Sequence, residues 1–168
     1  WLVELASLSE PLLVEEQVAA ALQVQEQPER PLRASLVDYL RRKELLLLLD
    51  NVEHLVQACA ELAQHLLTHC PRLKILVTGR EALYIPGEVT LQTPSLSLPA
   101  TNRDLDLTEI GASEAVQLFL ARAQAFRPDF ELDEGNAATI ADIVRRLDGI
   151  PLALELVTAR LRMLSVEQ

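Results

Sequence analysis

The stretch Leu45-Leu46-Leu47-Leu48-Leu49-Asp50 is the most informative part of the sequence, because five consecutive leucines run directly into one carboxylate. A short apolar run of this kind is typical of a strand inside a parallel sheet with helices on both faces. We therefore expect this strand to be buried on both sides. Its carboxyl end would open onto a ligand-binding crevice, which places Asp50 where a cation could bind. The alternative is that Asp50 only caps the helix that follows.

The composition indicates a globular protein of one or two small domains. The chain has 168 residues, of which 49% are hydrophobic and 24% are charged. No apolar stretch approaches the roughly 20 residues that span a bilayer, and no signal peptide opens the chain, so we expect a cytoplasmic protein without membrane contact. The net charge is −10 and Lys and Arg form no stripe. Direct contact of this segment with nucleic acid is therefore not expected.

Both ends suggest a piece of a longer protein. The chain begins at Trp1, already inside a strand-like run, and closes on Ser165-Val166-Glu167-Gln168, which fits an S-x-x-Q capping box at the start of a helix. Cys59 and Cys70 would lie about 16 Å apart on one helix, which is too far for a disulfide. We expect them to be buried thiols in a reducing compartment.

Around the leucine strand, strands and helices alternate. Trp1–Leu5 and Leu73–Val77 are predicted strands. Helices are predicted after Pro11, over a short segment carrying Leu32, Leu36, Tyr39 and Leu40, and over an apolar stripe from Val52 to Leu67. A right-handed crossover would make the leucine strand and Leu73–Val77 parallel. Asp50 and Arg80 would then share one edge of the sheet and could face one ligand.

The rest of the chain is mainly helical in pattern. A short strand is predicted at Val89–Gln92, and an irregular stretch follows from Pro94 to Arg103. Amphipathic stripes begin beyond Gly111, and Gly149 occupies a C′ position that ends a helix. A last helix is predicted from Pro151 to Leu164. We place the domain boundary near residue 105, with an α/β domain over residues 1–105 and a helical domain over residues 106–168.

Three motifs in fixed order carry a resemblance to a known family. They are Leu45-Leu-Leu-Leu-Leu-Asp50-Asn51-Val52-Glu53-His54, then Ile75-Leu-Val-Thr78-Gly79-Arg80-Glu81, then Leu147-Asp-Gly149-Ile150-Pro151-Leu152-Ala153, with the helix Ser113-Glu-Ala-Val-Gln-Leu-Phe119 before the third. The combination resembles the nucleotide-binding region of the STAND signal-transduction ATPases, in the NB-ARC-like branch found in large bacterial transcriptional regulators. The resemblance covers essentially the whole chain.

The resemblance implies a role for each matching residue. Asp50 matches the Walker B aspartate, which would organise Mg²⁺ on the phosphates of ATP or ADP. Thr78 and Arg80 belong to the sensor motif, in which Arg80 would read the terminal phosphate. Gly149 and Pro151 match a G-x-P motif whose proline packs against the nucleotide base. From the residues alone, Arg80 could also be an ordinary surface arginine, and Gly149 and Pro151 are equally well explained as helix punctuation.

The chain departs from the family pattern in two ways. Many relatives have a second acid after the Walker B aspartate, but here that residue is Asn51, and the nearest carboxylate is that of Glu53. Asn51 can orient a water but cannot accept its proton, so rapid hydrolysis is not expected. No G-x-x-x-x-G-K-[ST] loop occurs. The implied fold is an incomplete P-loop NTPase parallel sheet without its Walker A strand, followed by a small all-helical domain.

These observations predict a regulatory ATP/ADP switch segment of a larger signalling or transcription-regulating protein. The intact parent would be a slow ATPase, and this fragment by itself would be inactive. Its partners would be the nucleotide and other domains of the same chain, namely an upstream P-loop segment and downstream helical or sensor domains. The rival interpretation is a helical protein-interaction scaffold without nucleotide binding. His65 and His69 stand i, i+4 on a helix but lack a third ligand, so we interpret them as surface residues.

Overall fold

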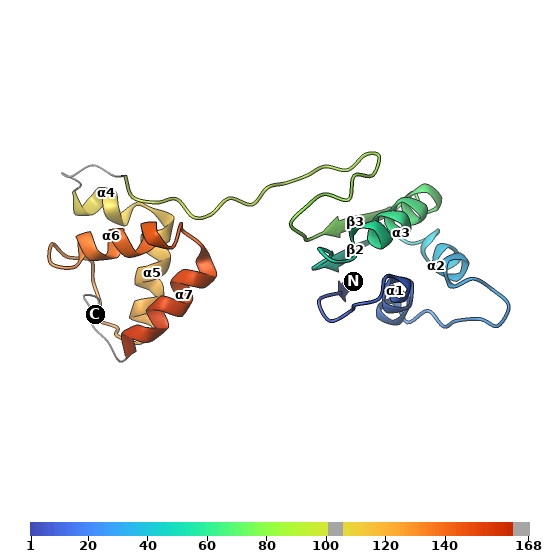
Figure 1. The fold of residues 1–168 in the computed structure, drawn as a ribbon, viewed down its shortest axis with the longest axis horizontal. Coiled ribbons are helices and arrows are strands. Elements are labelled where there is room, and N and C mark those ends of the chain that lie inside the picture. Colours follow the sequence, from blue (N-terminus) through green and yellow to red (C-terminus); the bar gives the residue numbers. More distant parts are fainter. Residues whose placement is uncertain (101–105, 163–168) are drawn as a thin grey trace. The chain divides into compact units, whose positions relative to one another are not determined.

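The chain divides into two compact units, Trp1–Leu91 and Gln92–Gln168. We call them the α/β unit and the helical unit. The structure is a computed structural model and describes residues 1–100 and 106–162 (Figure 1). The predicted capping box Ser165–Gln168 lies outside the described residues.

The α/β unit is built on a three-stranded parallel sheet. Its strands are β1 (Leu2–Glu4), β2 (Leu45–Asp50) and β3 (Leu73–Val77), in the order β1-β2-β3. Leu49 pairs with Val77, and Glu4 pairs with Asp50. The predicted parallel crossover from β2 to β3 is therefore confirmed, and a mixed α/β class is established.

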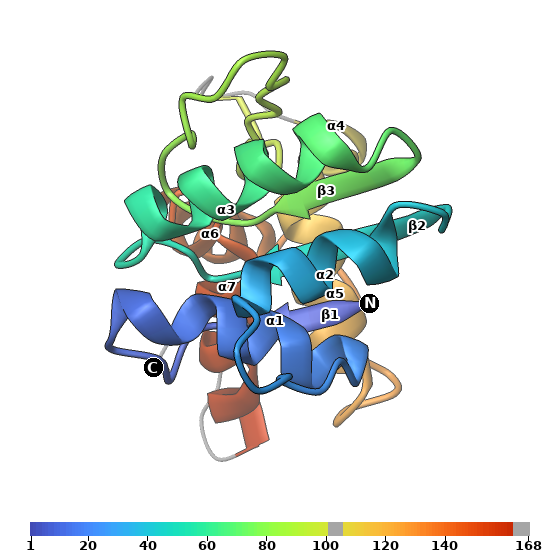
Figure 2. The same ribbon diagram turned by 90° about the vertical axis from the view of Figure 1, so that its right-hand side faces the viewer.

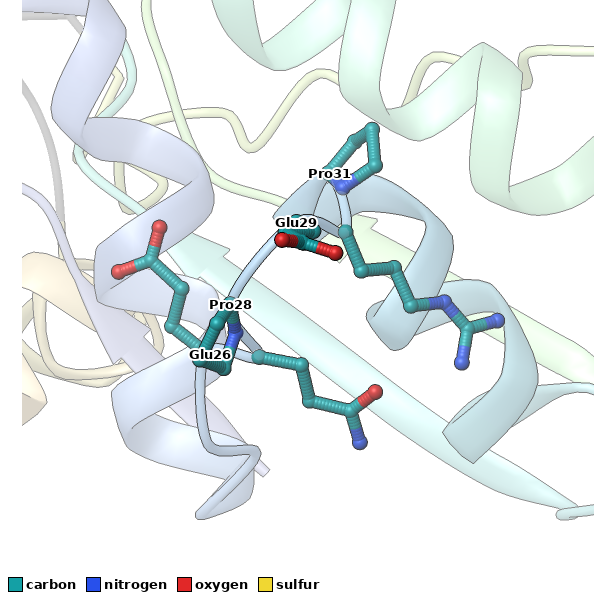
Figure 3. A pocket seen from close by; sticks show the side chains of 6 residues that line it. Glu26, Pro28, Glu29 and Pro31 are labelled. Carbon is teal, nitrogen blue, oxygen red and sulfur yellow. The ribbon is translucent and has the colours of Figure 1, made fainter.

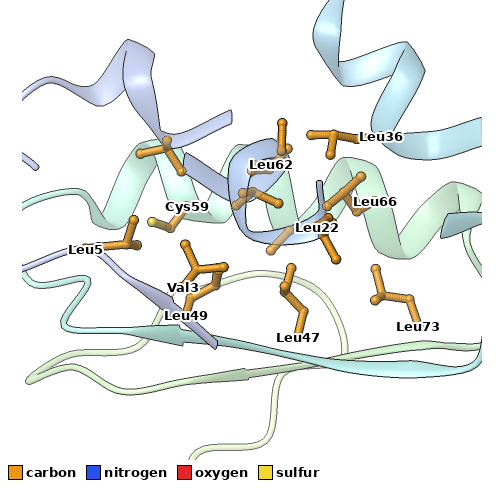
Figure 4. Close-up of a cluster of buried hydrophobic side chains, with 14 of the residues drawn as sticks. Val3, Leu5, Leu22, Leu36, Leu47, Leu49, Cys59, Leu62, Leu66 and Leu73 are labelled. Carbon is orange, nitrogen blue, oxygen red and sulfur yellow. The ribbon is translucent and has the colours of Figure 1, made fainter. Parts of the chain in front are cut away.

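Helices cover one face of this sheet. They are the 3₁₀ turn η1 (Pro11–Leu13), α1 (Val14–Leu22), α2 (Leu32–Leu40) and α3 (Val56–His69), and α1 to α3 lie on the same side of the strands in two perpendicular views (Figures 1 and 2). Between the layers, Val3, Leu47 and Leu49 point from the strands toward Leu22, Leu62 and Leu66 of the helices (Figure 4). Each such leucine contributes about 1.5–3 kcal/mol by leaving water.

The other face of the sheet is covered by none of the described helices of the α/β unit. Leu47 and Leu49 are buried, but Leu46 is 49% exposed, and Leu2 and Leu76 are also about half exposed. Successive side chains of a strand point to opposite faces, so only alternate leucines meet the helices. The expectation that the leucine strand is buried on both faces is therefore wrong for these residues. The leucine run marks where a second layer could pack, and none of the described helices of the α/β unit fills that place.

The helical unit is organised around α5. Its helices are α4 (Leu107–Gly111), α5 (Glu114–Gln124), α6 (Ala137–Arg146) and α7 (Pro151–Thr158), followed by the 3₁₀ turn η2 (Ala159–Arg162). α5 packs against both α6 and α7, and its Phe119 is fully buried among Ile140, Val144 and Leu154. The predicted last helix is thus α helical only to Thr158, and Leu164 lies beyond the described residues.

The link between the units differs from the prediction. Val89–Gln92 forms no strand, and the side chains of Val89 and Leu91 are 91% and 89% exposed. The unit boundary falls at Leu91 and not near residue 105. The reason is that the irregular segment after Leu91 forms hydrogen bonds with the helices of the helical unit. The Leu96 N–H donates to the Gly149 carbonyl at 3.0 Å, and the Ala115 N–H donates to the Ser97 carbonyl at 3.1 Å. None of the helices in the described ranges is long and apolar enough to cross a membrane.

Candidate functional site at the carboxyl end of the sheet

Asp50 is the last residue of β2 and lies beside the residue that follows β3. The Thr78 N–H donates to the Leu49 carbonyl at 3.0 Å, which extends the β2–β3 pairing to the end of the strands. On the other side, the Leu5 N–H donates to the Asp50 carbonyl at 3.0 Å. The end of β2 is thus held between both neighbouring strands, through the Leu49 carbonyl on one side and the Asp50 carbonyl on the other, at the edge where parallel sheets bind ligands.

The Thr78 hydroxyl connects two consecutive residues at the end of β2. It donates to Asp50 Oδ1 at 2.5 Å and accepts the Asn51 N–H at 3.0 Å. The Thr78 carbonyl accepts the Val52 N–H at 3.1 Å. The N–H, the carbonyl and the hydroxyl of Thr78 are therefore all hydrogen-bonded to residues 49–52.

Asn51 turns the chain sharply after Asp50. Its φ is 65°, in the left-handed region that asparagine tolerates better than most residues. The turn directs Val52 into the core, where it is fully buried. An asparagine at this position is therefore explained by backbone geometry as well as by any effect on a water molecule.

Asp50 does not cap the helix that follows it. α3 begins at Val56, its N-cap residue is Leu55, and no side chain caps it with a hydrogen bond. The alternative that Asp50 serves as a helix cap is therefore wrong, and its carboxylate bonds to the neighbouring strand instead. This contact is compatible with either a structural latch or a positioned ligand group.

Arg80 lies two residues beyond Thr78 and extends into solvent. Its side chain is 90% exposed, and its Nε lies 3.7 Å from Glu53 Oε1. An exposed ion pair of this length contributes between 0 and about 1 kcal/mol, so it does little to restrain the guanidinium. Gly79 brings the segment close to the turn after β2, because a Cβ there would lie 3.0 Å from Val52 Cγ2. Arg80 and Glu53 are thus neighbours at the same sheet edge as Asp50.

Two further residues at this edge were not identified from the sequence. Glu4 is the register partner of Asp50 on β1, and its side chain is exposed. His54 contacts the loop after β1, with Nε2 2.5 Å from the Leu8 carbonyl. The proximity of Glu4 to Asp50 is evident only from the strand register. His54 is part of the first sequence motif, but it was not predicted as a site residue.

Gly149 and Pro151 lie in the helical unit and have evident structural roles. Gly149 has a φ of +64°, and its N–H donates to the Val144 carbonyl at 3.2 Å, which terminates α6. A Cβ at this position would lie only 2.3 Å from the Leu96 carbonyl oxygen. Pro151 occupies the first turn of α7. The punctuation predicted for both residues is confirmed, and contact with a nucleotide base stays a prediction.

The remaining candidate groups form no ligand set. The His65 and His69 rings lie 4.5 Å apart, and His69 Nδ1 lies 2.8 Å from the His65 carbonyl. Slight burial and then the charge of His69 lower the pKa of His65. Within residues 1–100 and 106–162, no three His, Cys, Asp or Glu side chains gather as a metal site.

Both cysteines are buried free thiols, as predicted. Burial raises the pKa of Cys59 to about 11 and also raises that of Cys70. Neither thiol is therefore activated as a nucleophile at neutral pH.

A hollow in the connection between α1 and α2 includes none of the predicted site residues (Figure 3). Its lining consists of a short polar and proline-rich segment, Glu26, Gln27, Pro28, Glu29, Arg30 and Pro31. All six residues are exposed, so the hollow does not enclose a small molecule. We assign no function to it.

The chain is similar over nearly its whole length to longer mycobacterial proteins. A Mycobacterium bovis protein named "Putative HTH-type transcriptional regulator" is 40% identical over 163 residues, which are 97% of this chain and 17% of that protein. A Mycobacterium tuberculosis protein with the same description matches equally well. An uncharacterized protein of Mycobacterium tuberculosis is 38% identical over 165 residues, which are 98% of this chain and 39% of that protein. The chain therefore spans less than half the length of these curated relatives.

No family model matches the chain, and no solved structure shows a significant match. The names of the relatives fit a transcription-regulator context. They do not describe a nucleotide-binding activity.

Proposed function

We propose that this chain is a nucleotide-responsive segment of a larger regulatory protein, of the STAND ATPase type. In this proposal the α/β unit holds the phosphates of ATP or ADP with Mg²⁺, and the helical unit contributes Gly149 and Pro151 near the base. The observation that carries the proposal is the edge of the sheet where Asp50 is held by Thr78 and where Arg80, paired only with Glu53 in the described residues, is 90% exposed. A carboxylate for Mg²⁺ and an exposed cation for a phosphate are two of the charged groups that bind a nucleoside triphosphate.

The phosphate-binding loop is proposed to come from residues outside this chain. The 168 residues contain no G-x-x-x-x-G-K-[ST] motif. Within the described residues β3 pairs only with β2, so its outer edge can accept another strand. A strand added there would bring a following loop to the carboxyl edge that carries Asp50 and Arg80.

The proposed module acts as a slow switch. Asn51 cannot take a proton from water, and the Glu53 carboxylate faces Arg80. Arg80 would leave Glu53 for the terminal phosphate of ATP and return after hydrolysis or exchange. Such a difference between ATP and ADP can drive the movement of an attached domain.

The transcription-regulator context extends the proposal to the whole protein. Relatives that share 40% identity with this chain are named transcriptional regulators, and most of their length lies outside the matched segment. We infer that DNA contact is made elsewhere in such a protein, because this chain carries a net charge of −10. The segment would control that activity and would not bind DNA itself.

A protein-interaction scaffold remains the second candidate, and exposed apolar side chains favour it. Leu2, Leu46 and Leu76 are half exposed on the sheet, and Leu152 and Leu156 are about two-thirds exposed one turn apart on α7. Exposed apolar groups of this kind often mark protein contacts. The scaffold does not account for the fixed carboxylate of Asp50.

Two observations test the proposal. The first is the gene sequence ahead of the Trp1 codon, where a glycine-rich loop ending in Lys-Ser or Lys-Thr is expected. Its absence would favour the scaffold. The second is titration of the full-length protein with ATP and ADP, with and without Mg²⁺. Asp50→Ala should remove the magnesium-dependent part of binding, and Arg80→Ala should weaken ATP binding more than ADP binding.

The matched controls are Asp38→Ala and Arg30→Ala. Asp38 and Arg30 form an exposed ion pair in the same unit, away from the end of β2 in the sequence. Unchanged affinities in both Asp50→Ala and Arg80→Ala would show that the site assignment is wrong.

A further inference from the structure

We propose that Thr78 is a positioning residue, which orients the Asp50 carboxylate for Mg²⁺ and does not itself bind the nucleotide. This inference rests on the proposed function. The resemblance places Thr78 in the nucleotide-binding motif, but the structure shows that its hydroxyl proton is directed to Asp50 Oδ1. A hydroxyl has one proton to donate, so Thr78 has none left for a phosphate oxygen while this bond exists.

The bond constrains the carboxylate in one orientation. The rotation of an aspartate carboxylate about χ2 is broad and roughly two-fold, so an unrestrained Asp50 would present its oxygens in many directions. Thr78 holds Oδ1 at 2.5 Å. In the described part of the chain Oδ2 accepts no hydrogen bond, which leaves that oxygen for a cation. Hydrogen bonds of this kind to a ligating carboxylate tune metal affinity from outside the coordination sphere.

Thr78 is itself held firmly enough to act as such a support. Its N–H and carbonyl both pair with β2 and the turn after it, through Leu49 and Val52. Its hydroxyl also accepts the Asn51 N–H at 3.0 Å. The side chain therefore cannot rotate away from Asp50 without also releasing the Asn51 N–H.

The same contacts connect the cation position to Arg80. Gly79, between Thr78 and Arg80, packs against Val52 so closely that a Cβ would lie 3.0 Å from Val52 Cγ2. A cation that displaces Asp50 would therefore act on Thr78 and on the start of the segment that carries Arg80. Thr78 thus links the metal-binding end of β2 to the residue proposed to read the terminal phosphate.

The test compares two substitutions of Thr78 in the full-length protein. Thr78→Val keeps the shape and removes the hydroxyl, and Thr78→Ser keeps the hydroxyl. The measurement is the dissociation constant for ADP and ATP, once with Mg²⁺ and once with EDTA. Thr78→Val should weaken magnesium-dependent binding about tenfold and leave binding in EDTA unchanged. Thr78→Ser should stay within about twofold of wild type, because it restores the donor.

The control is Thr68→Val. The Thr68 hydroxyl donates to the Gln64 carbonyl at 2.7 Å on the exposed side of α3. Thr68→Val removes one threonine hydrogen bond, as Thr78→Val does, but it is expected to change neither the dissociation constant with Mg²⁺ nor that in EDTA. If Thr78→Val does not fold, Thr78→Cys replaces it, since a thiol is a weak donor of similar size and should give an intermediate loss.

The outcomes separate this inference from the proposed function. Equal affinity of wild type and Thr78→Val with Mg²⁺, or an equal loss in Mg²⁺ and in EDTA, would overturn the positioning role and leave the proposed function intact. If Thr78→Ser is as weak as Thr78→Val, the hydroxyl is not the active group and the inference is wrong. Absence of magnesium-dependent nucleotide binding in the wild-type protein would overturn both proposals.

Discussion

The α/β unit and the helical unit both carry residues of the predicted nucleotide site, but they fix those residues by different means. At the end of β2, side-chain hydrogen bonds from Thr78 hold Asp50, and charged groups remain directed to solvent. In the helical unit, Gly149 and Pro151 are determined by the backbone, because one ends α6 and the other begins α7. Folding alone therefore explains the G-x-P motif, whereas it does not explain an exposed arginine at the same sheet edge as a fixed carboxylate. The observations that favour a ligand thus lie in the α/β unit.

The largest effect should come from the helix-covered face of the sheet. Leu47→Ala is expected to lower the free energy of unfolding of the α/β unit by about 3 kcal/mol, because Leu47 is fully buried. Leu46→Ala is the matched control in the same strand. Since Leu46 is half exposed, its loss should stay below about 1 kcal/mol. Chemical denaturation with circular dichroism measures both, and equal losses would contradict an open sheet face.

The next effect concerns the helical unit. Gly149→Ala is expected to cost about 2–3 kcal/mol, because the left-handed φ strains alanine and its Cβ meets the Leu96 carbonyl. Gly87→Ala is the control, since Gly87 has a φ of +80° but no atom within 4 Å of an added Cβ. It should cost about 1 kcal/mol from backbone strain alone. Hydrogen exchange should localise the loss of Gly149→Ala to residues of the helical unit, and a loss no larger than that of Gly87→Ala would disprove the steric argument.

Alkaline pH should weaken the α/β unit selectively, since both cysteines lie there. Burial raises the pKa of Cys59 from an ordinary value of 9.0 to about 11. Below pH 9 the thiol is protonated in both folded and unfolded chains, and the stabilisation is complete. Between pH 9 and 11 only the unfolded chain ionises, so the free energy of unfolding falls as the pH rises. Urea titrations at pH 8, 9 and 10 check this, and an unchanged slope with pH in Cys59→Ala would exclude Cys59 as the cause.

The smallest effect concerns the segment that precedes the helices of the helical unit. Arg145 Nε donates to the Pro99 carbonyl at 3.2 Å, and a terminal guanidinium nitrogen donates to the Ala100 carbonyl at 2.5 Å. Arg145→Ala should therefore cost about 1 kcal/mol and speed hydrogen exchange in residues 96–100. Arg146→Ala is the control, because Arg146 is an exposed neighbour in α6. Thermal unfolding that does not distinguish the two variants would show that this segment is held by other contacts.

Local patterns predicted most of the elements correctly. β3 occupies the expected residues Leu73–Val77, and α7 begins at Pro151 as predicted. Apolar periodicity, proline and glycine act within a few residues, so the sequence contains the information directly. That Asp50 and the segment from Thr78 to Arg80 lie at one edge of the sheet also followed from the sequence, since a strand-helix-strand crossover leaves little choice of direction.

Contacts between distant residues could not be predicted in the same way. Val89–Gln92 has a strand pattern but no partner in the described residues, and a strand forms only when a neighbour supplies its hydrogen bonds. The leucines of β2 were expected to be buried on both faces of the sheet. A run of leucines shows that the strand is hydrophobic, but it does not show which face the helices cover. The proximity of Glu4 to Asp50 likewise depends on the register between β1 and β2.

Local sequence patterns were sufficient to predict the strands β1 to β3, most of the helices and one carboxylate at the end of an apolar strand. The tertiary structure decided what that carboxylate bonds to and which leucines meet helices. It also decided why Gly149 must lack a side chain. Each of these depends on atoms far apart in the chain, such as Thr78 beside Asp50 and Leu96 against Gly149. Local periodicity fixes the backbone conformation of a segment, and only packing fixes its neighbours.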